Sequence, residues 1–253
     1  HSQLCQIAPR TKPTMLQLIA PAKLNLCLDV LEKTSSAYHK IQTIFHATNQ
    51  IHNKITLTRS TQNKNQSIKN PLVKSAIQML DLEGKVDVEI EQNIPFSSGL
   101  GGESSNAATV LKGLNQLFEL NLKMVELLVI AKKLGMDVPF FILGGTALGT
   151  NYGEELTPLP QITIPLEIHP KSTNTKDKTA QAFAQLDLRK CGHNRDRTKA
   201  AINAIKNQDL TALATLLHND FETLYPMPSG LHLSGSGPST FKIQLAHSSP
   251  DSK

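Results

Sequence analysis

The sequence predicts a mixed α and β protein built from two parts, and three observations lead to this prediction. Residues 86–118 have the pattern of a strand, a glycine-rich loop and a helix in succession. Residues 24–30 alternate in side-chain character as a strand does. The chain of 253 residues is long enough for two domains, and prolines become dense at residues 158–165, so we divide it into residues 1–160 and 161–253.

The strand at residues 24–30 carries an unusual set of polar side chains. Its apolar residues are Leu24, Leu26, Leu28 and Val30, and the other series is Lys23, Asn25, Cys27 and Asp29. Because successive side chains of a strand point to opposite faces, we expect the second series to share one face. A solvated strand face is the alternative to a functional role for these residues.

The other elements follow from hydrophobic periodicity and from helix start and stop signals. In the N-terminal part we expect a strand at 55–57, a helix from Asn70-Pro71, a helix from near Ser104, a helix at 122–134 that ends at Gly135, and strand residues near 147–148. In the C-terminal part we expect a strand at 166–168, a polar loop at 171–178, two helices of which the second spans 210–217, a glycine-rich turn at 231–238 and a strand at 241–245.

Composition narrows the classes of function. The net charge of +5 suits an anionic substrate. Aromatic residues make up only 4% and tryptophan is absent, which argues against nucleic-acid binding, and no apolar run is long enough to span a membrane. Three widely spaced cysteines predict neither a disulfide framework nor a zinc site, as is typical of a reduced intracellular protein. These patterns do not indicate an oligomeric state or a set of metal ligands.

The glycine-rich loop between the strand and the helix predicts a phosphate-binding site. Glycines allow backbone N–H groups to approach an anion, and a helix N-terminus adds unpaired donors and partial positive charge. The loop lacks the Gly-Lys-Ser/Thr of a Walker A motif and the spacing of the dinucleotide fingerprint. We expect the phosphate groups of a ligand to contact Pro95, Ser97, Ser98, Gly99, Leu100, Gly101, Gly102, Ser104 and Ser105.

Three segments together, at residues 21–25, 95–108 and 234–241, resemble the three signature motifs of the GHMP kinase superfamily, and they occur in the same order. Further segments narrow the resemblance to the family of 4-diphosphocytidyl-2-C-methyl-D-erythritol kinases: residues 26–30, Tyr38-His39, Ile44-Phe45, residues 134–141, Gly153-Glu154 and residues 219–222. The resemblance implies an α+β, two-domain GHMP kinase fold. Its N-terminal part would resemble the ribosomal protein S5 domain 2-like fold and its C-terminal part a small α/β sandwich, with the active site between them.

The resemblance also implies an activity. A member of this family uses ATP and Mg²⁺ to phosphorylate the 2-hydroxyl of 4-diphosphocytidyl-2-C-methyl-D-erythritol in the non-mevalonate route to isoprenoids. The ligand whose phosphate groups contact the glycine-rich loop would then be ATP. It would work in the bacterial cytoplasm or in the plastid stroma. Asp137 would be the base, beside Lys23 and Asn25, while Tyr38 and His39 would recognise cytidine. The turn Gly235, Ser236 and Gly237 would close the site.

The chain also departs from the family pattern. Glu103 stands where a glycine is usual, and its charge or backbone strain would weaken ATP binding unless the side chain points outward. Ala37 replaces the glycine before Tyr38, and the path between Asn219 and Ser234 is short. The alternatives are another GHMP kinase of the homoserine or mevalonate type, or a binding protein without activity. Taken alone, Asp137 could be a helix cap, Tyr38 a surface residue, and the segment at Gly235 a simple turn.

Overall fold

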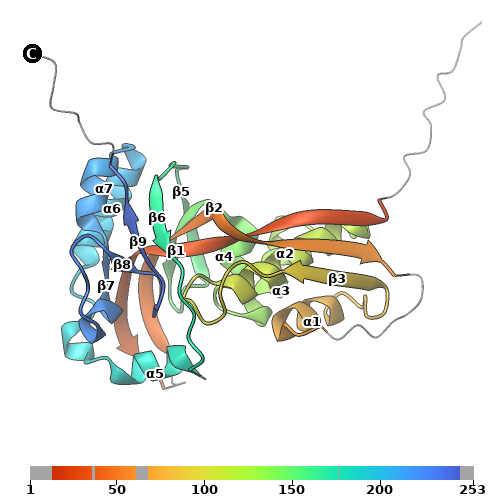
Figure 1. The fold of residues 1–253 in the computed structure, drawn as a ribbon, viewed down its shortest axis with the longest axis horizontal. Helices are drawn as coiled ribbons and strands as arrows, with labels where there is room; N and C mark the ends of the chain where they lie inside the picture. Colours follow the sequence, from red (N-terminus) through yellow and green to blue (C-terminus); the bar gives the residue numbers. More distant parts are fainter. Residues whose placement is uncertain (1–12, 36–37, 61–67, 176, 246–253) are drawn as a thin grey trace, which may run out of the picture.

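Two long antiparallel strands organise the protein, β1 (Met15–Lys33) and β2 (His39–Arg59). Figure 1 shows them running along most of the length of the molecule. The computed structural model describes residues 13–35, 38–60, 68–175 and 177–245. Ala37 lies outside them, so the predicted effect of this residue on the following turn is not tested.

β1 and β2 belong to a six-stranded sheet with the order β5-β4-β2-β1-β7, in which β3 also pairs with β2. The other strands of this sheet are β3 (Val86–Glu91), β4 (Thr146–Thr150), β5 (Glu155–Leu159) and β7 (His218–Asn219). β7 runs parallel to β1, whereas β3 and β4 are antiparallel to β2. Residues from near the C-terminal end of the chain therefore complete a sheet that begins at its N-terminal end.

The helices of the N-terminal part share one hydrophobic core with this sheet. They are α1 (Pro71–Gln78), α2 (Gly102–Leu117), α3 (Met124–Leu134) and α4 (Val138–Leu143). Apolar residues of all these helices pack with Phe45, Ile55 and Leu57 of β2. α1 begins as predicted, because the Asn70 side chain accepts hydrogen bonds from the first turn. The prediction for α2 was late by two residues, since this helix begins at Gly102.

The C-terminal part contains a three-stranded sheet and a group of helices. The sheet has the order β6 (Leu166–His169), β9 (Thr240–Ile243) and β8 (His232–Leu233). Helices α5 (Lys178–Gln185), α6 (Arg195–Lys206) and α7 (Leu210–Leu216) lie in the same part, so the prediction of two helices was too low. Leu245 lies beyond β9 and is exposed. The switch of sheets between β5 and β6 lies at the predicted boundary, but the division into domains at residue 160 stays a prediction.

A β-bulge in β1 changes which side chains face the same way. The register with β2 shifts between Asn25 and Cys27, so Leu26 has no opposite residue. Before the bulge, Lys23 and Asn25 line a cavity. After it Leu28 does so, while Cys27 packs with Leu24 and Leu26. The prediction that Lys23, Asn25, Cys27 and Asp29 share one face was therefore wrong for the last two residues.

Two further expectations concern the segment between Asn219 and Ser234 and membrane-spanning helices. Residues 225–231 contain turns and no helix, in line with the short path noted from Asn219 to Ser234. None of the helices in the described ranges is long and apolar enough to cross a membrane.

Candidate active site

A cavity of about 730 Å³ lies where β1, the glycine-rich loop, the 234–237 turn and α5 meet. All three predicted motifs contact one another through hydrogen bonds to backbone atoms. The Ser234 hydroxyl donates to the Gly99 carbonyl (2.9 Å) and to the Lys23 carbonyl (3.2 Å), and the Ser239 N–H donates to Ser98 O (3.0 Å). Segments far apart in the sequence thus form one wall.

The glycine-rich loop needs its glycines at the positions where it turns. Gly99 and Gly101 have φ values of +84° and +73°, a region that L side chains rarely adopt. A Cβ atom at Gly99 would lie 2.1 Å from Ser234 O, so no other residue fits between the two turns. Backbone N–H groups at the start of α2 remain without partners in the helix itself, because the first turn of any helix has none. This geometry is suited to binding a phosphate.

Lys23 and Asp137 approach each other inside the cavity. The Lys23 Nζ lies 3.9 Å from Asp137 Oδ2 and donates a hydrogen bond of 2.5 Å to Asn25 Oδ1. The Asn25 amide in turn donates to Thr43 Oγ1 (2.8 Å), which fixes the orientation of its oxygen toward Lys23. Lys23 and Asn25 are only 4% and 2% exposed, so the alternative of a solvated strand face is wrong. Burial lowers the pKa of the Lys23 ammonium, and the charge of Asp137 counteracts this effect.

Asp137 stands directly before α4, but its role is not that of a cap. Within the described residues its side chain makes no capping hydrogen bond to α4, and it lines the cavity. Three other acidic residues that we did not assign to the site have structural contacts instead. Asp220 accepts from backbone N–H groups, Glu154 from the Tyr152 N–H, and Asp187 from the Arg189 N–H.

The opposite end of the cavity is aromatic. The ring of His39 stacks on Phe183 with 4.6 Å between centroids, and Phe183 meets Phe221 edge to face. Tyr38 and Tyr152 lie 5.7 Å apart, and Tyr38 is 56% exposed at the cavity wall. Burial, together with the charge of Lys33, lowers the pKa of His39, so this imidazole is neutral at pH 7.

Most of the predicted site residues line this cavity, and some do not. Leu100, Ser105 and Gly237 lie outside its lining, and the first two are fully buried. Sequence reasoning placed no site residue at several positions that do line it: Lys33, Gln92, Phe96, Tyr152, Thr179, Phe183 and Phe221. No local motif distinguishes these residues, because the fold gathers them from β1, α5, η2 (Asp220–Leu224) and the segments that follow β3 and β4.

Glu103 lies in the first turn of α2, where it is exposed and lines the cavity, and its effect on ATP binding stays a prediction. Its backbone is not among those with positive φ, and strain is therefore not a consequence of this residue. Together with Asp137 it gives the cavity two carboxylates, which balance the ammonium groups of Lys23 and Lys33. A ligand rich in phosphate would gain little from the net charge of the lining.

Known proteins of one family resemble this chain in sequence. Residues 71–145 match the model of the GHMP kinases N terminal domain. A 4-diphosphocytidyl-2-C-methyl-D-erythritol kinase of Caldicellulosiruptor bescii is 34% identical over 259 residues, covering 90% of this chain and 89% of the relative. A protein of the same name from Gloeobacter violaceus is 32% identical, covering 90% and 85%.

Solved structures agree. The crystal structure of a 4-(cytidine 5'-diphospho)-2C-methyl-D-erythritol kinase matches with a TM-score of 0.69 and 25% identity, covering 90% of both chains. A homoserine kinase from Cytophaga hutchinsonii matches with a TM-score of 0.69 at 17% identity, covering 95% of this chain and 88% of that one, which is a likeness of fold alone. The predicted α+β GHMP kinase fold is confirmed. The chain belongs to the family of 4-diphosphocytidyl-2-C-methyl-D-erythritol kinases, within the GHMP kinases.

Proposed function

We propose that this protein transfers the γ-phosphoryl group of ATP to the 2-hydroxyl of 4-diphosphocytidyl-2-C-methyl-D-erythritol. The products are the 2-phosphate and ADP, in the non-mevalonate route to isoprenoids. The observation that carries the proposal is one cavity with a phosphate-type loop, the Lys23–Asp137 pair and an aromatic end. We place the reaction in the bacterial cytoplasm, or in the plastid stroma if the protein is eukaryotic, where ATP is available.

The donor end is the loop at residues 95–104. Backbone N–H groups of the loop and of the first turn of α2 would hold the ATP phosphates, with the Ser104 hydroxyl beside them. The described residues include no group of three His, Cys, Asp or Glu side chains that would hold a metal. Mg²⁺ commonly takes one or two carboxylates and the substrate phosphates as ligands. Glu103, Asp137 and Ser104 offer such oxygens, and bound Mg²⁺ would neutralise phosphate charge.

The transfer step is assigned to Asp137 and Lys23. The hydroxyl oxygen of the acceptor forms a bond to the γ-phosphorus while the bond to the β,γ-bridging oxygen breaks, and ADP leaves. The Asp137 carboxylate accepts the proton of the hydroxyl group. The Lys23 ammonium, held by Asn25, stabilises the charge on the moving phosphoryl group. Positioning of this kind supplies most of the catalysis in phosphoryl transfer.

The acceptor end is assigned to the aromatic residues. A cytosine ring has flat faces that stack on Tyr38 and Phe183, which line the same end of the cavity. Neutral His39 offers one ring N–H donor and one acceptor to the edge of the base. The backbone of Gly235 and Ser236 closes this space opposite β1, and we keep Gly237 as part of that turn although it does not line the cavity.

The proposal is tested by measuring ADP release with Mg²⁺-ATP and a panel of alcohols. We expect turnover with the cytidine-linked acceptor and none with homoserine or mevalonate, because these alcohols carry no base for the aromatic end. Turnover with either small alcohol would replace the proposal by the other GHMP kinase activity. Binding of nucleotide without turnover of any alcohol would favour a binding protein, for which Glu103 in the cavity is the one specific observation.

A further inference from the structure

The segment Asn219–Glu222 takes no part in the proposed reaction, yet its side chains are bonded to the wall of the site. Asn219 is buried, and its amide nitrogen donates to Leu233 O (2.9 Å) and to Gly235 O (2.8 Å). Its oxygen accepts from the Phe221 N–H (3.0 Å). Both donors of this side chain are thus used on backbone carbonyls of the strand and turn that lead to Gly235.

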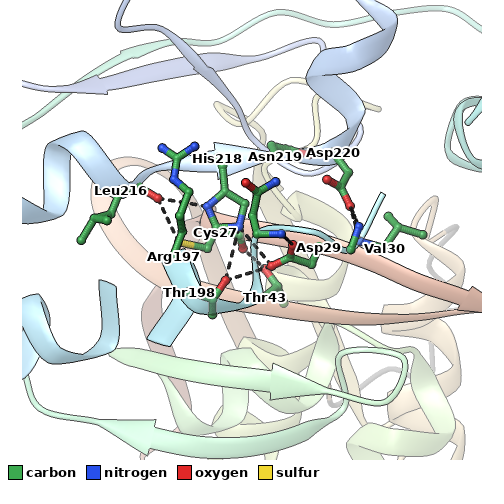
Figure 2. Close-up of polar contacts among 12 residues, drawn as sticks. Cys27, Asp29, Val30, Thr43, Arg197, Thr198, Leu216, His218, Asn219 and Asp220 are labelled. Carbon is green, nitrogen blue, oxygen red and sulfur yellow. Dashed lines mark hydrogen bonds and ion pairs between the residues drawn. The ribbon is translucent and has the colours of Figure 1, made fainter. Parts of the chain in front are cut away.

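The same segment is fastened to β1. Asp220 Oδ2 accepts from the Val30 N–H (2.7 Å) and from the Gly192 N–H (2.8 Å), and Figure 2 shows the first of these contacts beside Asn219. Asn219 itself pairs with Leu28 where β7 runs along β1. The segment therefore links the strand that carries Lys23 to the turn that faces it.

The position of the turn matters because it lies against the Lys23 ammonium. Gly235 has a φ of +56°, and a Cβ atom there would lie 3.2 Å from Lys23 Nζ and 3.3 Å from Gly99 O. A small shift of the turn would consequently change the space around Lys23 and the wall of the phosphate loop. Glu222 also fixes the strand before the turn, since its carboxylate accepts from the Leu233 N–H (2.9 Å).

We infer that Asn219 is a positioning residue for phosphoryl transfer, which holds the Gly235 turn at a fixed distance from Lys23. The inference rests on the proposed function. Asparagine suits the task because it offers two donors and one acceptor on a short side chain, and all three are satisfied here. An aspartate of the same shape would present acceptors to two carbonyl oxygens, and an alanine would leave both carbonyls unpaired in a buried place.

The chain offers a matched control at Asn115. This side chain also donates to a backbone carbonyl and accepts from a backbone N–H, both of Leu122, but it lies at the end of α2 and does not line the cavity. Asn219→Ala and Asn115→Ala therefore both remove a side-chain amide. The first removes it from the contact with the buried turn at Gly235, and the second removes it from a contact that is remote from the cavity. We expect Asn219→Ala to lower kcat about 100-fold, with little change in the KM for ATP. Asn115→Ala should retain the kcat of the wild type at a comparable loss of Tm.

Two further readouts separate positioning from a general loss of stability. Backbone hydrogen exchange should become faster at residues 232–238 in Asn219→Ala and stay unchanged there in Asn115→Ala. Asn219→Asp should regain activity relative to the wild type as the pH falls, because a protonated carboxyl group donates one hydrogen bond to a carbonyl. If Asn219→Ala does not fold, kcat and hydrogen exchange are measured on Asn219→Ser instead, and the same results test the positioning role.

The outcomes are distinguishable from those that test the reaction itself. A wild type without activity contradicts the proposed function, while the exchange measurement still reports on the turn. An active wild type whose kcat survives Asn219→Ala, or equal losses of kcat in both variants, would overturn the positioning role. Unchanged exchange at residues 232–238 would overturn it as well.

Discussion

Replacing His218 by leucine should destabilise the protein by leaving a carboxylate buried without its charged partner. His218 contacts Asp29 (Figure 2), with 3.0 Å between His218 Nε2 and Asp29 Oδ2. The two side chains are 5% and 0% exposed. Asp29 also accepts hydrogen bonds from Thr198 Oγ1 (2.9 Å) and from the Asn194 N–H (3.0 Å). The pair joins β1 to β7 and α6, so its loss weakens the packing of the C-terminal part on the large sheet.

The magnitude follows from the burial and from the remaining partners. Burial alone would lower the pKa of His218, but hydrogen bonds to Asp29 and neighbouring groups raise it to about 10. At about 1.4 kcal/mol per pKa unit, the rise of the His218 pKa from 6.5 sets an upper limit of about 5 kcal/mol on what the charged imidazole contributes to the free energy of unfolding. Removing one partner of a buried pair typically costs roughly 3–5 kcal/mol. Because Asp29 keeps two hydrogen bonds, we expect His218→Leu to lose about 3 kcal/mol of unfolding free energy near pH 6.

The dependence on pH has a definite sign. Since the pKa of His218 is raised on folding, its contribution is complete below about pH 6.5 and is lost as the pH rises toward 10. Burial raises the pKa of Asp29, but its hydrogen bonds and the charge of His218 lower it overall, so its contribution is lost only in acid, below the usual carboxyl range. The difference in stability between wild type and His218→Leu should therefore be largest between about pH 4 and 6.5 and should shrink toward pH 10.

Urea unfolding of both proteins across this range measures that difference. Comparing the two proteins cancels the contributions of Lys23, Lys112 and Lys178, whose pKa values burial lowers and which act in the opposite direction. A double-mutant cycle with Asp29→Asn should give a coupling energy of about 1–3 kcal/mol. A difference in unfolding free energy that stays constant from pH 6 to 10, or a coupling energy near zero, would refute the inference that His218 and Asp29 form a charged pair.

Other predictions concern the cavity. Glu103→Gly should raise the affinity for ATP without Mg²⁺ about two- to fivefold in calorimetry, because it removes a carboxylate from the lining; unchanged affinity would mean that the charge is screened. Phe183→Leu should raise the KM for the cytidine-linked acceptor about tenfold and leave that for ATP unchanged, whereas equal changes would place the base elsewhere. Gly235→Ala should lower kcat at least about tenfold in steady-state assays, because its Cβ would press on Lys23; wild-type kcat would show that the turn adapts.

Local patterns predicted the elements that depend on local causes. The start of α1 follows from the Asn70 cap and Pro71, and the end of α3 at Leu134 follows from Gly135. The long apolar alternation predicted β1. The bulge at Leu26 could not be predicted, because it depends on pairing with β2, and it moved Asp29 from the expected cavity face to the buried pair with His218.

The residues of the candidate site also fall into two groups, those that the sequence could indicate and those that only the fold reveals. Gly99 could be selected from the glycine-rich loop itself, whereas Lys23 and Asp137 were selected through the resemblance to the family motifs, because a lysine on a strand or an aspartate before a helix is not informative alone. Tyr152 and Phe183 could not be selected, since an aromatic residue on a loop or helix has the same local pattern whether it packs in a core or lines a cavity. Only the fold, which brings α5 next to Tyr38-His39, shows that they belong to the site.

The most direct measurement is ADP release with Mg²⁺-ATP, with and without 4-diphosphocytidyl-2-C-methyl-D-erythritol, for the wild type and for Asp137→Ala. Nucleotide binding by calorimetry shows that both proteins are folded and loaded. We predict acceptor-dependent release in the wild type and a loss of at least about 100-fold in the variant. A folded wild type that binds ATP and the acceptor but releases no ADP, or a variant as active as the wild type, would contradict the proposed reaction and the role of Asp137.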